Sequence, residues 1–196
     1  MQITHTKIPT EEDKVTLEDW IADHNIEGGG TFKLPQLIEE KTLSAGTTTV
    51  TFSNLDGDND KEYYIIGDVF IVSGGGDRII TIKPNNITTN QAGIRVYHFN
   101  YPALDRTSIS TLQFAMNGWG ADSYCHSEAK LIAETGKPRL YSNHTIDGIV
   151  GSYKGGQMIK AEWNENSTNI TSLVFAIDGG SFSGTIKLYK MVDITL

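Results

Sequence analysis

The sequence predicts an all-β fold, an antiparallel β-sandwich, behind a short helical segment at the N-terminus. Short segments rich in β-branched and aromatic residues follow one another from residue 47 to the C-terminus, and turns rich in Gly and Asn separate them. Glycine contributes 20 of the 196 residues, and no stretch after residue 26 has the apolar spacing of an amphipathic helix. Strands joined by tight turns are therefore expected throughout the main part of the chain.

The N-terminal helical segment is expected within residues 16–26. Its apolar face consists of Leu17, Trp20, Ile21 and His24, which follow the i, i+3, i+4, i+7 spacing of one helix face. A helix of this length is unstable by itself in water, where roughly 12–15 residues are needed even for marginal helicity. The segment must therefore pack on something, and two alternatives remain open: the protein's own main domain, or a partner molecule.

A glycine-rich stretch separates this segment from the strands. Residues 28–30 are consecutive glycines, and residues 27–36 have the composition of a linker. The chain is therefore expected to comprise an N-terminal docking segment with its linker, residues 1–36, and a β-sandwich, residues 37–196.

The expected strands are recognised by alternation or by continuous apolar runs. Residues 47–52 alternate Thr with larger side chains, so that Val50 and Phe52 point inward. Residues 62–72 are almost continuously apolar, as in a strand that is covered on both faces or bent at Gly67. Further strands are expected at residues 78–83, 93–99, 108–116, 129–134, 139–142, 157–163, 170–177 and 184–192. About eight to ten short strands of this kind predict a sandwich of jelly-roll type.

Composition and charge argue against several classes of function. The formal net charge of −8 argues against non-specific binding to nucleic acids and against adhesion to anionic membranes, because both require clustered Lys and Arg. No apolar run approaches the length of a transmembrane helix, and the first residues lack a signal-peptide pattern. The protein is therefore expected to be made in the cytoplasm and not to insert into a membrane.

An acidic segment, Asp56–Asp60, resembles the start of a calcium-binding loop. The complete EF-hand pattern requires Gly at the sixth position and Glu at the twelfth, where this chain has Lys61 and Gly67. A solvent-exposed acidic hairpin turn is therefore expected. A weak calcium site completed by distant residues remains the alternative.

The sequence offers no recognisable catalytic or cofactor-binding pattern. The five histidines lack the spacing of metal ligands, and neither a nucleophile elbow nor a phosphate-binding loop occurs in the sequence. Cys125 is the only cysteine and is expected to be a buried thiol, not a nucleophile. We therefore expect a non-enzymatic protein without metal or cofactor. A glycan-degrading enzyme would need two carboxylates that the fold brings together.

A loop with an aromatic residue is the main candidate for a binding site. Trp119 lies between two glycines, and Asn117, Asp122 and Tyr124 lie close to it in the chain. Exposed aromatic rings stack on sugar rings or fill an oligomer interface, so these four residues are candidate glycan contacts. The alternative is that Trp119 closes one end of the core.

Parts of the chain resemble structural proteins of tailed bacteriophages. The string Asp-Trp-Ile-Ala-Asp-His at residues 19–24 resembles the Asp-Trp-Asn-Ala-x-His motif near the N-terminus of many tailed-phage virion proteins, with Ile21 where Asn is common. Residues 47–66, with the turn Phe-Ser-Asn-Leu-Asp-Gly-Asp, and residues 183–190, Ser-Gly-Thr-Ile-Lys-Leu-Tyr-Lys, resemble β-domains of the same class of proteins. Together these stretches cover about a fifth of the chain.

This resemblance implies a non-enzymatic structural protein on the surface of the virion, made in the host cytoplasm. Proteins of that family are capsid-decoration, head-fibre or tail-fibre proteins, and the resemblance transfers no catalytic residue. Residues 1–36 are then expected to attach the chain to other capsid or tail proteins, and a closed homo-oligomer, a trimer, is expected. The alternative function is a carbohydrate-binding host-adhesion module of a phage receptor-binding protein, with the loop around Trp119 as its glycan contact.

Overall fold

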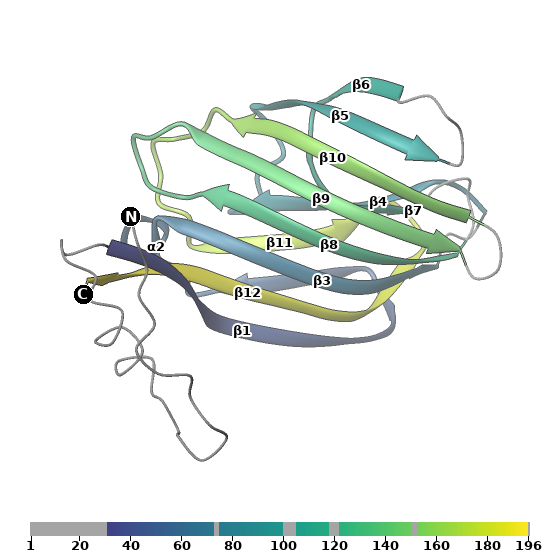
Figure 1. The fold of residues 1–196 in the computed structure, drawn as a ribbon, viewed down its shortest axis with the longest axis horizontal. Helices are drawn as coiled ribbons and strands as arrows, with labels where there is room; N and C mark the ends of the chain where they lie inside the picture. Colours follow the sequence, from purple (N-terminus) through teal and green to yellow (C-terminus); the bar gives the residue numbers. More distant parts are fainter. Residues whose placement is uncertain (1–30, 73–74, 100–104, 118–121, 150–152, 196) are drawn as a thin grey trace, which may run out of the picture. The chain divides into compact units, whose positions relative to one another are not determined.

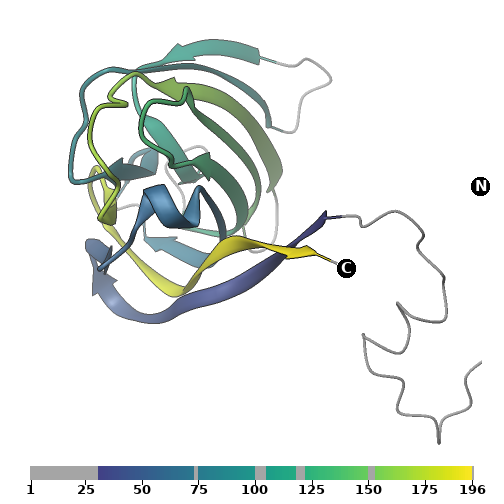
Figure 2. The ribbon, with the colours of Figure 1, turned by 90° about the vertical axis from the view of Figure 1, so that its left-hand side faces the viewer.

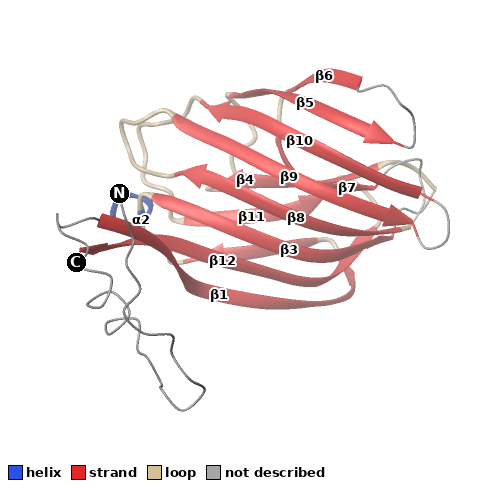
Figure 3. Cartoon of the chain, in the orientation of Figure 1, coloured by secondary structure: helices blue, strands red, loops and turns tan. Residues whose placement is uncertain are grey.

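The computed structural model describes residues 31–72, 75–99, 105–117, 122–149 and 153–195, most of which lie in β-strands (Figure 1, Figure 3). The described elements are β1 (Thr31–Thr47), β2 (Thr49–Ser53), α2 (Gly57–Asp60), β3 (Glu62–Val72), β4 (Arg78–Pro84), β5 (Gln91–Phe99), β6 (Asp105–Ile109), β7 (Leu112–Asn117), β8 (Ser123–Ile132), β9 (Arg139–Ile149), β10 (Tyr153–Trp163), β11 (Ser172–Ile177) and β12 (Ser181–Thr195). The all-β prediction is confirmed, whereas the expected N-terminal helix lies outside the described residues. No helix in the described part of the chain is long and apolar enough to span a membrane.

The strands form two sheets with antiparallel pairing. The large sheet has eight strands in the order β1-β12-β3-β8-β9-β10-β5-β6, and the small sheet has four in the order β2-β11-β4-β7. The chain divides into two compact units, and nearly all of both sheets belongs to the larger unit, Pro35–Met191. Within this unit the large sheet curves over the small one, as Figure 2 shows from the end. The apolar core lies between the two sheets.

The core is built by alternate residues of the facing strands. In β8 buried and exposed residues alternate along almost the whole strand, as expected where one face of a strand covers a core. At the centre, the ring centroid of Phe175 lies 5.6 Å from that of Phe52 and 5.1 Å from that of Phe114, both in edge-on arrangements. Phe52 is fully buried and Val50 packs against the core, as the alternation of residues 47–52 predicts.

Gly67 allows a close approach between the two sheets. It lies in the middle of β3, where a Cβ atom would be only 2.6 Å from the ring of Phe114. A larger residue would displace that ring from a close-packed core. On the opposite face of β3, Tyr64, Ile66 and Phe70 are only partly buried, so this strand is not fully covered on both faces.

The edge of the small sheet is covered by side chains of the large sheet. Because β7 is the last strand of the small sheet, its outward carbonyl groups have no strand partner. Tyr141 Oη donates a hydrogen bond to the carbonyl of Gln113 (2.8 Å). Asn143 Nδ2 (3.1 Å) and Thr145 Oγ1 (2.8 Å) both donate to the carbonyl of Phe114. Alternate residues of β9 thus donate hydrogen bonds to the carbonyl groups of β7 that have no strand partner.

The acidic segment forms a helical turn where only a hairpin turn was predicted. The single turn of α2 spans Gly57–Asp60, and its N-cap residue Asp56 accepts a hydrogen bond from the backbone nitrogen of Asn59. Asp58 Oδ1 accepts a second one from the backbone nitrogen of Thr135 (2.7 Å). These carboxylates therefore hold the turn and a neighbouring loop, and no group of three or more His, Cys, Asp or Glu among the described residues is placed to hold a metal ion.

Several strand boundaries differ from the prediction; for example, β8 and β9 are longer than the strands expected at residues 129–134 and 139–142. β1 begins at Thr31, so part of the stretch 27–36 that was expected to be linker is strand. An edge strand tolerates Pro35 because its missing N–H group need not face the neighbouring strand. The single strand expected at 108–116 is divided between β6 and β7, because a bend at residues 110–111 takes the chain from the large sheet to the small one.

Candidate functional site

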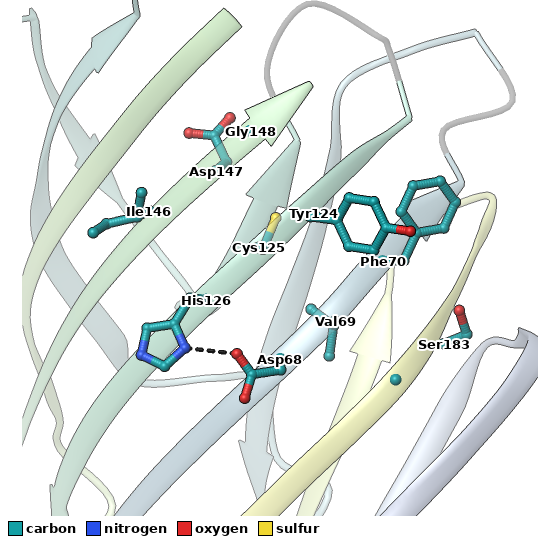
Figure 4. A pocket seen from close by; sticks show the side chains of 11 residues that line it. Asp68, Val69, Phe70, Tyr124, Cys125, His126, Ile146, Asp147, Gly148 and Ser183 are labelled. Carbon is teal, nitrogen blue, oxygen red and sulfur yellow. Dashed lines mark hydrogen bonds and ion pairs between the residues drawn. The ribbon is translucent and has the colours of Figure 1, made fainter. Parts of the chain in front are cut away.

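A shallow hollow of about 740 Å³ lies on the large sheet, over strands β12, β3, β8 and β9 (Figure 4). Its volume falls within the range of roughly 300–1,000 Å³ that small-molecule sites occupy. The side chains relevant to its chemistry come from three neighbouring strands: Asp68 and Phe70 from β3, Tyr124 and His126 from β8, and Ile146 from β9, beside Gly148.

Two aromatic side chains form one wall of the hollow. Phe70 and Tyr124 are directly opposite each other in the pairing of β3 with β8, so both side chains leave the sheet on the same face. Their ring centroids are 4.6 Å apart and the ring planes are inclined by 49°. Tyr124 is 60% exposed, so a ligand in the hollow can reach a face of its ring.

A histidine between two carboxylates lies next to the aromatic wall. Asp68 and His126 are directly opposite each other in the same strand pairing, two residues along each strand from Phe70 and Tyr124 and therefore on the same face. His126 Nδ1 donates to Asp68 Oδ1 (2.7 Å), and His126 Nε2 lies 3.5 Å from Glu128 Oε1. The hydrogen bond to Asp68 raises the pKa of His126 above its ordinary value; partial burial acts against this increase, and the contact with Glu128 adds to it.

Glycines lie on both strands that flank the aromatic and charged residues of the hollow, and they have different roles. Gly148 lies opposite Tyr124 in the pairing of β8 with β9, and a Cβ atom on it would meet nothing within 4 Å. Gly184 in β12 has φ +117°, and a Cβ atom there would lie 2.2 Å from the carbonyl oxygen of Asp68. Gly184 is therefore required by the backbone, whereas Gly148 leaves space that a side chain would fill.

The nearby thiol points away from the hollow and into the core. Cys125 is 3% exposed, and its Sγ donates a weak hydrogen bond to the carbonyl of Met116 (3.5 Å). Burial raises the pKa of Cys125 to about 12, so the thiol stays protonated at neutral pH. The predicted buried thiol is confirmed, and strand alternation places Cys125 and His126 on opposite faces of the sheet.

The structure describes only part of the sites predicted from the sequence. The docking residues Leu17, Trp20, Ile21 and His24 and the loop residue Trp119 lie outside the described residues. Among the other candidate glycan contacts, Asn117 is the last residue of β7, Asp122 is exposed just before β8, and Tyr124 faces the hollow.

Sequence reasoning found one residue of the hollow and missed its partners. Phe70 and Asp68 were not predicted as site residues, because they are 54 and 58 residues away from the β8 residues that they face. His126 was considered only as a metal ligand, with the other histidines. The available signal was the alternation within each strand, which places residues 68 and 70 on one face and residues 124 and 126 on one face. The strand pairing that joins these two faces is not visible in the alternation.

The hollow is lined by two aromatic rings, a carboxylate, an imidazole and the hydroxyl group of Ser183. This set of groups is suited to holding a polar ligand against an aromatic surface. Comparison of the chain with protein-family models, curated proteins and solved structures finds no match.

Proposed function

We propose that this chain is a non-enzymatic structural protein of a tailed-bacteriophage particle, displayed on the particle surface as a decoration, fibre or tail-appendage protein. The observation that carries the proposal is the strand order, which fits a jelly roll, an architecture used by viral capsid and lectin domains. The resemblance of residues 19–24 to phage virion proteins supports it from the sequence. A fold by itself does not establish a function, so the proposal depends on both observations together.

The proposed jelly roll is supported by two groups of four neighbouring strands. In the large sheet these are β1-β12-β3-β8, and in the small sheet β2-β11-β4-β7. Along the chain, the first four strands alternate between the sheets: β1 and β3 lie in the large sheet, and β2 and β4 lie in the small one. The other four alternate in the opposite order: β7 and β11 lie in the small sheet, and β8 and β12 lie in the large one. This winding supports the proposed jelly roll of eight strands in two Greek keys. The pairs β5–β6 and β9–β10 are then hairpin insertions that widen the large sheet.

The proposed attachment to the particle uses residues 1–36, with Leu17, Trp20, Ile21 and His24 as the contact face, and a trimer as the assembly. We expect Trp20→Ala to lower the amount of this protein on purified phage particles, because Trp20 contributes the largest apolar surface of that face. The assay is quantitative immunoblotting of particles, with Trp119→Ala as the control. Normal incorporation of a correctly folded Trp20→Ala protein would refute the attachment role.

A second candidate function is host adhesion through a surface glycan. The exposed ring of Tyr124 beside Phe70, in a hollow of suitable size, favours it. The expected result is binding to host cell-wall or capsule polysaccharide that Tyr124→Ala weakens. Loss of binding in Trp119→Ala and not in Tyr124→Ala would instead assign the contact to the loop between β7 and β8.

A further inference from the structure

We propose that the hollow on the large sheet selects ligands that carry an ammonium group, as in an amino sugar or a choline headgroup. The inference rests on the hollow being a binding site, as in the adhesion candidate, and it adds the chemistry of the ligand. Three features carry it: the aromatic wall, the sign of the charge around it, and the open space above Gly148.

The aromatic wall offers a face to a cation. Recognition of ammonium groups by proteins relies on aromatic rings whose faces lie within about 6 Å of the positive charge. Phe70 and Tyr124 stand with their ring centroids 4.6 Å apart, inclined at 49°, so a single ammonium group next to Tyr124 also comes near Phe70. The 60% exposure of Tyr124 leaves its ring accessible from the solvent.

The charges next to the wall are predominantly negative. Asp68 and Glu128 flank His126 at 2.7 Å and 3.5 Å, and both carboxylates are exposed on the same face of the sheet. Two carboxylates outweigh one imidazole even when the imidazole is protonated, so the group has a net negative charge in either state. Among the described residues that line the hollow, none is Lys or Arg. A cation is therefore attracted, and a carboxylate or phosphate ligand is repelled.

The hollow is also large enough for a substituted ammonium group. The Oδ1 atom of Asp68 accepts from His126, while its side chain remains 69% exposed and can accept a further hydrogen bond. Gly148 lies opposite Tyr124, and a Cβ atom built on Gly148 would have no atom within 4 Å, so the space above it is free. This space lies on the side of Tyr124 away from Phe70, where a methylated ammonium or the ring of an amino sugar would meet the Tyr124 ring without displacing the backbone.

The test is a titration of the full chain with four small ligands at constant pH and ionic strength. Binding is measured from the changes in amide chemical shifts in NMR spectra. Glucosamine, glucose and glucuronate share a sugar ring and differ in charge, and choline carries an ammonium group without a sugar. We expect glucosamine and choline to bind at least about tenfold more tightly than glucose, and glucuronate to bind most weakly. Binding of choline alone assigns the site to headgroups, and binding of glucosamine alone assigns it to amino sugars.

Three variants and one control connect the binding to the hollow. Tyr124→Leu keeps an apolar side chain without a π face, Asp68→Asn keeps the shape without the charge, and Gly148→Leu fills the space. Each is expected to weaken glucosamine or choline binding by about fivefold or more, whereas Leu140→Ser, on the same face but at the far end of β9, leaves it unchanged. Thermal unfolding of each variant checks that the fold is retained.

The outcomes separate this inference from the adhesion candidate. Equal binding of glucose and glucosamine at the hollow overturns the ammonium selectivity and leaves adhesion standing. Binding that Tyr124→Leu and Gly148→Leu do not weaken places the ligand elsewhere and overturns the inference. Absence of binding by all four ligands overturns it as well, while polysaccharide binding that is sensitive to Trp119→Ala would still support adhesion through the loop.

Discussion

Replacement of Arg139 by methionine should lower the free energy of unfolding by about 3 kcal/mol. The Arg139 side chain is fully buried at the start of β9. Its Nη1 donates a hydrogen bond to the carbonyl of Glu165 (2.8 Å), and its Nη2 donates one to the carbonyl of Thr168. The guanidinium group therefore holds the segment between β10 and β11 against the start of β9. Its guanidinium group also lies 4.7 Å from the ring centroid of Trp163.

The magnitude follows from these contacts. A hydrogen bond from a charged donor contributes about 1.5 kcal/mol at the low end of measured values, and a cation–π contact about 1 kcal/mol. Two such bonds and the stacking on Trp163 together amount to about 4 kcal/mol. Methionine keeps most of the apolar volume and removes the cost of burying a charge, including an Nε atom that has no hydrogen-bond partner. This relief lowers the expected net loss to about 3 kcal/mol.

The assay is equilibrium unfolding in urea, followed by tryptophan fluorescence and circular dichroism. With a slope of about 2 kcal/mol per molar urea, the midpoint should decrease by about 1.5 M. Lys137→Met is the matched control, because Lys137 is exposed two residues before Arg139 and should change stability by less than about 0.5 kcal/mol. A loss below 1 kcal/mol in Arg139→Met would show that the segment between β10 and β11 does not depend on the guanidinium group.

Three further predictions follow from single sites. Gly67→Ala should destabilise the protein by about 1–3 kcal/mol in the same urea assay, because the new methyl group would overlap the ring of Phe114. Cys125 should not react with a thiol reagent in the native protein at pH 8 and should react fully in denaturant, because it is buried and its pKa is raised to about 12. The pKa of His126 measured by NMR should exceed that of an unfolded histidine and should fall towards it in Asp68→Asn. The stabilisation linked to His126 is fully present below its unfolded pKa, about 6.5, and is lost as the pH rises through the higher folded value.

For each of these three predictions, one experimental result would contradict the physical reason given. Unchanged stability of Gly67→Ala would mean that the two sheets separate at no cost at this point. Fast labelling of native Cys125 would require the strand alternation of β8 to be wrong. A His126 pKa that Asp68→Asn leaves unchanged would show that the 2.7 Å hydrogen bond does not control the imidazole. Because His126 is about half exposed, its effect on stability should stay below about 1 kcal/mol.

Much of the local structure is predictable because it depends on neighbouring residues only. Alternation predicts that Leu173, Phe175 and Ile177 share one face, and the first two are fully buried while Ile177 packs against the core. The buried thiol of Cys125 follows from residue type and isolation in the sequence. The glycine-rich start of residues 27–36, in contrast, suggested a linker where β1 had already begun, because edge strands lack a strong sequence signal.

The sequence by itself determined that this chain is all-β, which residues alternate, and where most turns occur, since these properties follow from the two-residue period of a strand. For strands with mixed faces, such as β5, only the tertiary structure decided which face is inside. In β5 the inner, partly buried face carries Arg95, whose Nη1 donates to Gln113 Oε1 (3.2 Å), while Ile94 on the other face is 38% exposed, the reverse of what hydropathy favours. The contact between Phe70 and Tyr124 was likewise decided by the tertiary structure alone, because strand pairing joins distant parts of the chain. The alternation within each strand is the same whichever residues of the two strands are paired, so it does not predict this contact.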